Sequence, residues 1–160
     1  MDRKLVALKL LLEEVGIRIR TNNIVDRKTL QKAICLIQAS GIDLGYEFNW
    51  YLKGPYSSAL SDDYYNLVRA IDKEKIRKSE YPLTESVTKK IREIQDIFKP
   101  ELQFKKGKSD WLELVASVCF LRNSGRTWIE VKEIIENRKP HLSVYVDVAK
   151  RKLKKVGLVS

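Results

Sequence analysis

About seven stretches of this 160-residue chain repeat apolar side chains every three to four positions, which is the spacing of one face of an α-helix. Residues that cap or break helices, such as Gly16, Pro100 and Pro140, separate these stretches. The stretches begin near Asp2, Asp26, Leu60, Thr84, Ser109, Thr127 and Ser143. Because the connections between them vary in length, the pattern predicts a mainly α protein, a compact orthogonal bundle of about seven helices.

The segment from Tyr46 to Leu60 departs from this helical period. Apolar Phe48, Trp50 and Leu52 alternate there with Glu47, Asn49 and Tyr51, as in a half-buried strand. Gly54-Pro55 ends the alternation, with the proline at a first helical position and Ser57 or Ser58 as the cap. We expect one or two short strands before a corner, Gly54-Pro55-Tyr56-Ser57, with Tyr51 and Tyr56 at least partly exposed.

The second predicted helix places Leu30, Ala33, Ile34 and Ile37 on one face, so Arg27, Lys28 and Lys32 are expected near the opposite side. Thr127 and Glu130 have the spacing of a capping box. The helix with Leu112, Val115 and Cys119 is the most apolar and is expected at the centre.

A single domain covering residues 1–160 is expected, because no repeat, low-complexity tract or long Pro/Gly/Ser-rich linker divides the chain. Residues 109–160 are a candidate helix-turn-helix-like lobe within it. Cys35 and Cys119 lie far apart in apolar helical patterns, which predicts buried, reduced thiols. Lys9 and Glu13 interrupt the apolar run near the N-terminus, so we expect neither a signal peptide nor a membrane span, and a cytoplasmic protein.

The formal net charge is +10, which favours an acidic partner such as nucleic acid, an acidic protein or anionic lipid. A Lys- and Glu-rich composition is also typical of the solvated surfaces of thermophilic proteins. Charge alone does not choose between these interpretations.

Residues typical of catalysis are sparse. His141 lies beside a proline with no nucleophile or metal ligand in its local pattern, and no Gly-rich phosphate loop is present. Glu130-Val131-Lys132 has the spacing of some metal-dependent nucleases, although those residues normally lie on a strand. The leading hypothesis is therefore a protein that is not an enzyme and has no cofactor or metal, with nuclease chemistry as an alternative.

The last predicted helix carries Lys150, Arg151, Lys154 and Lys155 opposite its apolar face. Such cations would contact DNA phosphates without reading sequence, since the helix has no Asn or Gln to contact bases. A DNA-binding regulator is the second hypothesis. The first is a protein-recognition surface built by Tyr51, Gly54, Pro55, Tyr56 and Ser57, because rigid aromatic side chains dominate protein-binding hot spots.

Three groups of residues resemble one protein family. They are Arg27-Lys28-x-Leu30-Gln31-Lys32, then Phe48-x-Trp50-Tyr51-x-x-Gly54-Pro55-Tyr56-Ser57-x-x-Leu60, then Trp111-Leu112-Glu113-Leu114. In this order they resemble the Panacea (SocA-like) antitoxin domain and the related YwgA-like uncharacterised proteins, over nearly the whole chain. The chain departs from that pattern at Ile34-Cys35-Leu36, where an aromatic residue is common. The resemblance implies a mostly helical domain without known catalysis that binds a protein partner, in several members a toxin.

Overall fold

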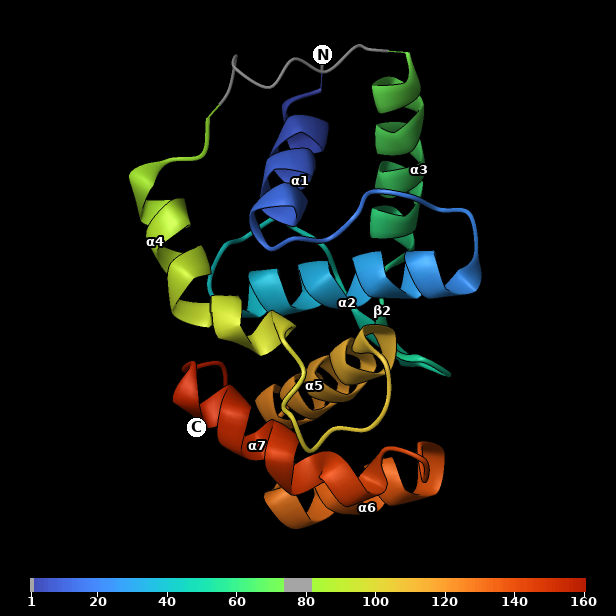
Figure 1. Cartoon of the computed structure of the whole chain (residues 1–160), viewed down its shortest axis with the longest axis vertical. Helices are drawn as coiled ribbons and strands as arrows, with labels where there is room; N and C mark the ends of the chain where they lie inside the picture. Colours follow the sequence, from blue (N-terminus) through green and yellow to red (C-terminus); the bar gives the residue numbers. More distant parts are fainter. Residues whose placement is uncertain (1, 74–81) are drawn as a thin grey trace.

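The structure is a computed structural model that describes residues 2–73 and 82–160. Within these residues it contains seven α-helices, two 3-10 helices and one two-stranded antiparallel sheet, which confirms the predicted mainly helical bundle with short strands (Figure 1). In chain order the elements are α1 (Arg3–Glu14), α2 (Ile24–Ala39), β1 (Asn49–Tyr51), β2 (Gly54–Tyr56), α3 (Ser58–Asp72), α4 (Glu85–Ile94), η1 (Gln95–Phe98), α5 (Lys108–Asn123), α6 (Trp128–Arg138), η2 (Ser143–Tyr145) and α7 (Val146–Lys155).

Helices α2 and α5 form the middle of the molecule and pack against each other (Figure 1). Figure 1 shows α1, α3 and α4 on one side of this pair and α6 and α7 on the other. As predicted, α5 is central, and nearly all of its residues from Trp111 to Leu121 are buried. The indole Nε1 of Trp111 donates a hydrogen bond of 2.7 Å to the Ile97 carbonyl, so this large side chain is both packed and satisfied.

Side-chain caps start most of the helices where the sequence places a short polar residue. Ser57 caps α3, Thr84 caps α4, and Thr127 with Glu130 forms the predicted capping box of α6. The sequence predicts Asp26 as the cap of the second helix, but Asn23 caps α2, and the helix begins at Ile24, two residues before Asp26. These caps satisfy backbone N–H groups that have no partner inside the helix.

Several boundaries differ from the prediction. Helix α5 begins at Lys108 after Gly107, so Ser109 is inside the helix and does not cap it. The final helix opens with the 3-10 turn η2, and α7 itself starts only at Val146. The sequence also predicts a basic connection from Lys73 to Lys78, which lies outside the described residues apart from Lys73.

Both cysteines are buried and free, as predicted, and burial raises the pKa of each thiol to about 12. Leu158 and Val159 fold back onto the core after Gly157 ends the last helix. Within the described residues, no helix is long and apolar enough to cross a membrane.

Candidate functional site

The predicted corner is the second half of a β-hairpin. Strand β1 pairs with β2 in antiparallel register, with Trp50 opposite Pro55 and Tyr51 opposite Gly54, and Leu52 and Lys53 form the turn. Pro55 is therefore a strand residue, and the expectation that it occupies a first helical position was wrong. A proline is tolerated there because this small sheet leaves both of its strands at an edge.

Gly54 is the one residue in the hairpin that must be glycine. Its φ of +96° lies in the left-handed region, which side chains with a Cβ rarely adopt. A Cβ at this position would lie 2.5 Å from the Ser117 Oγ of α5, closer than any real contact. The hairpin backbone thus packs directly on α5, because Gly54 has no side chain.

Side-chain hydrogen bonds from Gln31 and Lys32 of α2 fix the backbone of the corner Gly54-Pro55-Tyr56-Ser57. The Gln31 side-chain amide donates to the Ser57 carbonyl at 2.8 Å and accepts from the Ser57 N–H at 2.9 Å. The Lys32 Nζ donates to the Pro55 carbonyl at 2.6 Å. Gly54, Pro55 and Ser57 are consequently buried, and the Ser57 amide is occupied within the protein.

The two predicted surface tyrosines do reach the surface. Tyr51 is 54% exposed and Tyr56 is partly buried, and their rings meet edge to face with centroids 5.3 Å apart. Phe48 and Trp50 pack against the core on the opposite side, as the alternation predicts. Leu52 breaks the alternation: it is 92% exposed, because it lies in the turn and not in the strand.

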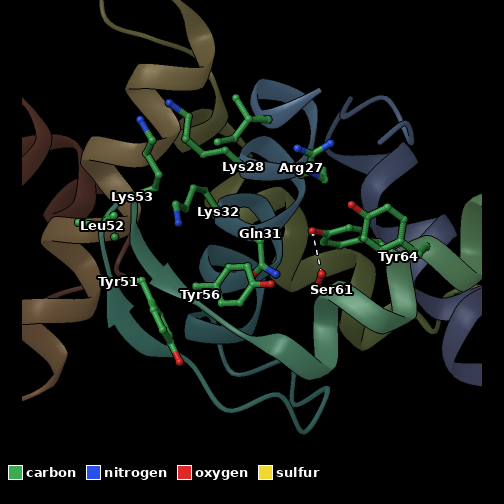
Figure 2. Close-up of a pocket in the computed structure, with 13 residues that line it drawn as sticks. Arg27, Lys28, Gln31, Lys32, Tyr51, Leu52, Lys53, Tyr56, Ser61 and Tyr64 are labelled. Carbon is green, nitrogen blue, oxygen red and sulfur yellow. Dashed lines mark hydrogen bonds between the residues drawn. The ribbon is translucent and has the colours of Figure 1, made fainter. Parts of the chain in front are cut away.

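A pocket of about 370 Å³ opens between the hairpin, α2 and the start of α3 (Figure 2). We call it the tyrosine pocket; it is lined by Ile24, Arg27, Lys28, Gln31 and Lys32 of α2, Tyr51, Leu52, Lys53, Gly54 and Tyr56 of the hairpin, and Ser61, Tyr64 and Tyr65 of α3. Figure 2 shows the basic side chains Arg27, Lys28 and Lys53 toward one end and the tyrosine rings toward the other.

Exposed apolar side chains gather at this pocket. The described residues include eight large apolar side chains that are exposed, and four of them line the tyrosine pocket: Ile24, Tyr51, Leu52 and Tyr65. Single exposed apolar residues are ordinary, but a cluster around a hollow is typical of a binding site.

A buried ionic network supports the pocket from the side of α5. The Glu113 carboxylate accepts from Lys28 Nζ at 2.9 Å through one oxygen and from Lys139 Nζ at 2.8 Å through the other. Lys28 also contacts Asp110 at 3.3 Å, and Lys139 also donates to the Leu52 carbonyl at 3.0 Å. Burial acts to raise the pKa of Glu113, but the hydrogen bonds and charges of Lys139 and Lys28 outweigh it and leave that pKa below its ordinary value.

Lys32 has no carboxylate in this network. Its side chain is 1% exposed, which corrects the expectation that it lies on the outer side of α2. Burial lowers the pKa of Lys32 to about 8, and the charges of Lys139 and Lys28 act in the same direction while Glu113 opposes them. Lys32 is thus a buried ammonium whose charge is only partly compensated.

The four basic residues of the alternative site lie on α7, and the structure adds an aromatic neighbour to them. Lys150 Nζ lies 4.7 Å and Lys154 Nζ 5.7 Å from the ring centroid of Trp128, and the Arg122 guanidinium lies 4.9 Å from it. Arg151 and Lys155 are exposed. Within the described residues, none of the four α7 cations forms an ion pair with a carboxylate.

The proposed nuclease residues lie on α6. Glu130 accepts from the Thr127 backbone N–H at 3.0 Å within the capping box, and that hydrogen bond lowers the pKa of its carboxylate. Lys132 and His141 are exposed. In the part of the chain that the structure describes, no group of three or more His, Cys, Asp or Glu side chains is placed to hold a metal ion.

The sequence interpretation missed Lys32 and Glu113 as parts of one site. Both are polar residues inside otherwise apolar helical runs, and this was the signal that could have identified them. Comparison of the chain with family models, with curated proteins and with solved structures found no match. The family resemblance therefore rests on the residues quoted for it.

Proposed function

We propose that this protein is a non-enzymatic binding and regulatory protein, an antitoxin-like interaction module that takes a protein partner at the tyrosine pocket. The observation that supports this proposal best is the gathering of Ile24, Tyr51, Leu52 and Tyr65 around one pocket. Tyrosine offers a large contact area at a small cost in side-chain entropy, and buried aromatic contacts dominate protein-binding energies.

The hairpin that presents two of these side chains, Tyr51 and Leu52, is held in place before any partner binds. Gln31, Lys32 and Lys139 bind three of its backbone segments, at Ser57, Pro55 and Leu52, and Gly54 packs on Ser117. A recognition surface that is already ordered loses less conformational entropy on binding. The expected partner surface combines apolar side chains for the pocket with acidic side chains for its basic end.

Site-specific photo-crosslinking in cells of the natural host tests this function. A photoreactive phenylalanine analogue is placed at Leu52, beside the pocket, and in a separate variant at Leu102, which is 94% exposed and lies outside the pocket. We expect one defined protein adduct from position 52 and none from position 102. No adduct at position 52, or the same adduct from both positions, would contradict the proposal.

A second candidate function, DNA binding through Lys150, Arg151, Lys154 and Lys155, is supported by the cations around Trp128 and by their lack of carboxylate partners in the described chain. Phosphate contacts of this kind weaken steeply with salt. We expect Lys150→Glu with Lys154→Glu to abolish a duplex mobility shift. The matched control is Lys105→Glu with Lys106→Glu, two exposed lysines outside this face. Equal loss in both double variants would reject α7 as the contact face.

A further inference from the structure

We propose that the Lys32 ammonium binds a carboxylate of the partner polypeptide, so that the segment recognised by the tyrosine pocket pairs an acidic group with an apolar side chain. This inference rests on the proposed function and adds the chemistry of the bound segment. Three observations support it: the Lys32 ammonium has unused N–H donors, the carboxylates of the neighbouring ionic network pair with other lysines, and the pocket lining is basic.

The buried ammonium of Lys32 has hydrogen-bond donors without an acceptor among the described residues, and burying such donors costs free energy. An ammonium group has three N–H donors, and within the described residues the Nζ of Lys32 has one acceptor, the Pro55 carbonyl at 2.6 Å. The side chain is 1% exposed and lines the tyrosine pocket. A buried charge without a counter-ion is unfavourable, so a ligand anion at this nitrogen would relieve that cost.

The two carboxylates of the ionic network beside the pocket, Glu113 and Asp110, are already paired with other lysines. The two oxygens of Glu113 accept from Lys28 and Lys139, and Asp110 contacts Lys28. Each of those two lysines therefore has a carboxylate, and Lys32 differs from them in having only a carbonyl. The counter-ion that Lys32 lacks has to come from outside the described part of the chain.

The lining of the pocket selects the class of anion. Among the described residues that line the pocket are Arg27, Lys28, Lys32 and Lys53 and no acidic residue, so the charge of this lining favours an anion. Its other walls are mainly tyrosine, leucine and isoleucine side chains. A carboxylate has two oxygens for the two remaining donors of Lys32, and in a peptide it can lie next to an apolar side chain that contacts the apolar walls. A phosphate would place more charge and more oxygen atoms against those apolar walls.

Peptide titrations followed by the backbone amide signals of the isotope-labelled protein test the inference. One pair of probes is N-acetyl-Phe-Glu-Leu-amide and its Gln analogue, which tests a side-chain carboxylate. A second pair is N-acetyl-Phe-Leu with a free carboxylate and the same dipeptide as an amide, which tests a chain terminus. Inorganic phosphate is the third arm. We expect at least one carboxylate peptide to bind about tenfold or more tightly than its neutral partner, with shifts at Lys32 and Tyr56.

The variant Lys32→Met keeps most of the length of the side chain and removes its charge, and Lys106→Met removes an equal charge from an exposed residue outside the pocket lining. We expect the carboxylate preference to disappear in Lys32→Met and to change less than threefold in Lys106→Met. Retained folding is checked by circular dichroism of both variants.

Equal binding of carboxylate and neutral peptides would overturn the role of Lys32 and leave apolar docking intact. Binding of none of the peptides, or of phosphate alone, would also overturn it. The photo-crosslinking experiment at position 52 tests the proposed function separately from these titrations.

Discussion

Replacing Lys32 with methionine should change how stability depends on pH, because this lysine titrates differently in the folded and unfolded chains. Burial lowers its pKa from 10.5 to about 8 in the folded protein. Below pH 8 the ammonium is charged in both states, and the folded protein carries the full cost of burying it. Between pH 8 and 10.5 the unfolded chain is protonated and the folded chain is not, so the wild type gains stability as pH rises.

The size of the effect follows from the shift. A pKa unit corresponds to about 1.4 kcal/mol, so a depression of this size amounts to about 3 kcal/mol over the whole window, of which about 2 kcal/mol appears by pH 9.5. Lys32→Met has no titrating ammonium at this position, so its stability lacks this increase with pH. The free energy of unfolding of Lys32→Met minus that of the wild type should therefore fall by about 2 kcal/mol between pH 7 and pH 9.5.

Urea unfolding of both proteins at pH 7, 8, 8.75 and 9.5, followed by tryptophan fluorescence, measures this difference. The cysteines and Tyr46 also have raised pKa values, but both proteins contain them, so their effects largely cancel in the difference. A difference that stays constant over this range would show that Lys32 is not buried as a charged group, and it would refute the reasoning for its role in the pocket.

Two further substitutions test the supports of the hairpin. Gly54→Ala should lower the free energy of unfolding by about 3 kcal/mol, because it adds left-handed strain and a clash with Ser117 Oγ. Adding Ser117→Ala should remove only the clash, so the double variant Gly54→Ala with Ser117→Ala should recover part of the lost stability in thermal unfolding. No recovery would contradict the close approach of Gly54 to Ser117. Glu113→Gln should cost about 3 kcal/mol in chemical denaturation, since it leaves Lys139 buried without a counter-ion. Adding Lys139→Met should restore stability, and a loss equal to the sum of both variants would contradict the pairing.

The helices could be predicted because their signals are local. Leu5, Leu8 and Leu12 repeat at helical spacing, Thr84 and Thr127 stand where caps are needed, and Gly157 ends the last helix. Each of these features depends on residues within a few positions of each other. The same holds for the outward direction of Tyr51, which follows from alternation in a strand.

The candidate site could be predicted only in part, because its supports come from distant parts of the chain. Lys32 looks like a surface lysine on a helical wheel, and its burial results from packing against a hairpin more than 20 residues away. Glu113 meets Lys28 and Lys139 from two other helical regions. Pro55 suggested a helix start by its local chemistry, whereas pairing with Trp50 decides that it lies in a strand.

The central claim is that a protein partner docks at the tyrosine pocket, and the affinity of the partner trapped at position 52 tests it most directly. Calorimetry would compare the wild type with Leu52→Asp and with Leu102→Asp, two changes at leucines that are almost fully exposed. We predict binding at least about tenfold weaker for Leu52→Asp, since an anchor residue contributes more than 1 kcal/mol, and unchanged binding for Leu102→Asp. Equal affinity of all three proteins would contradict the account.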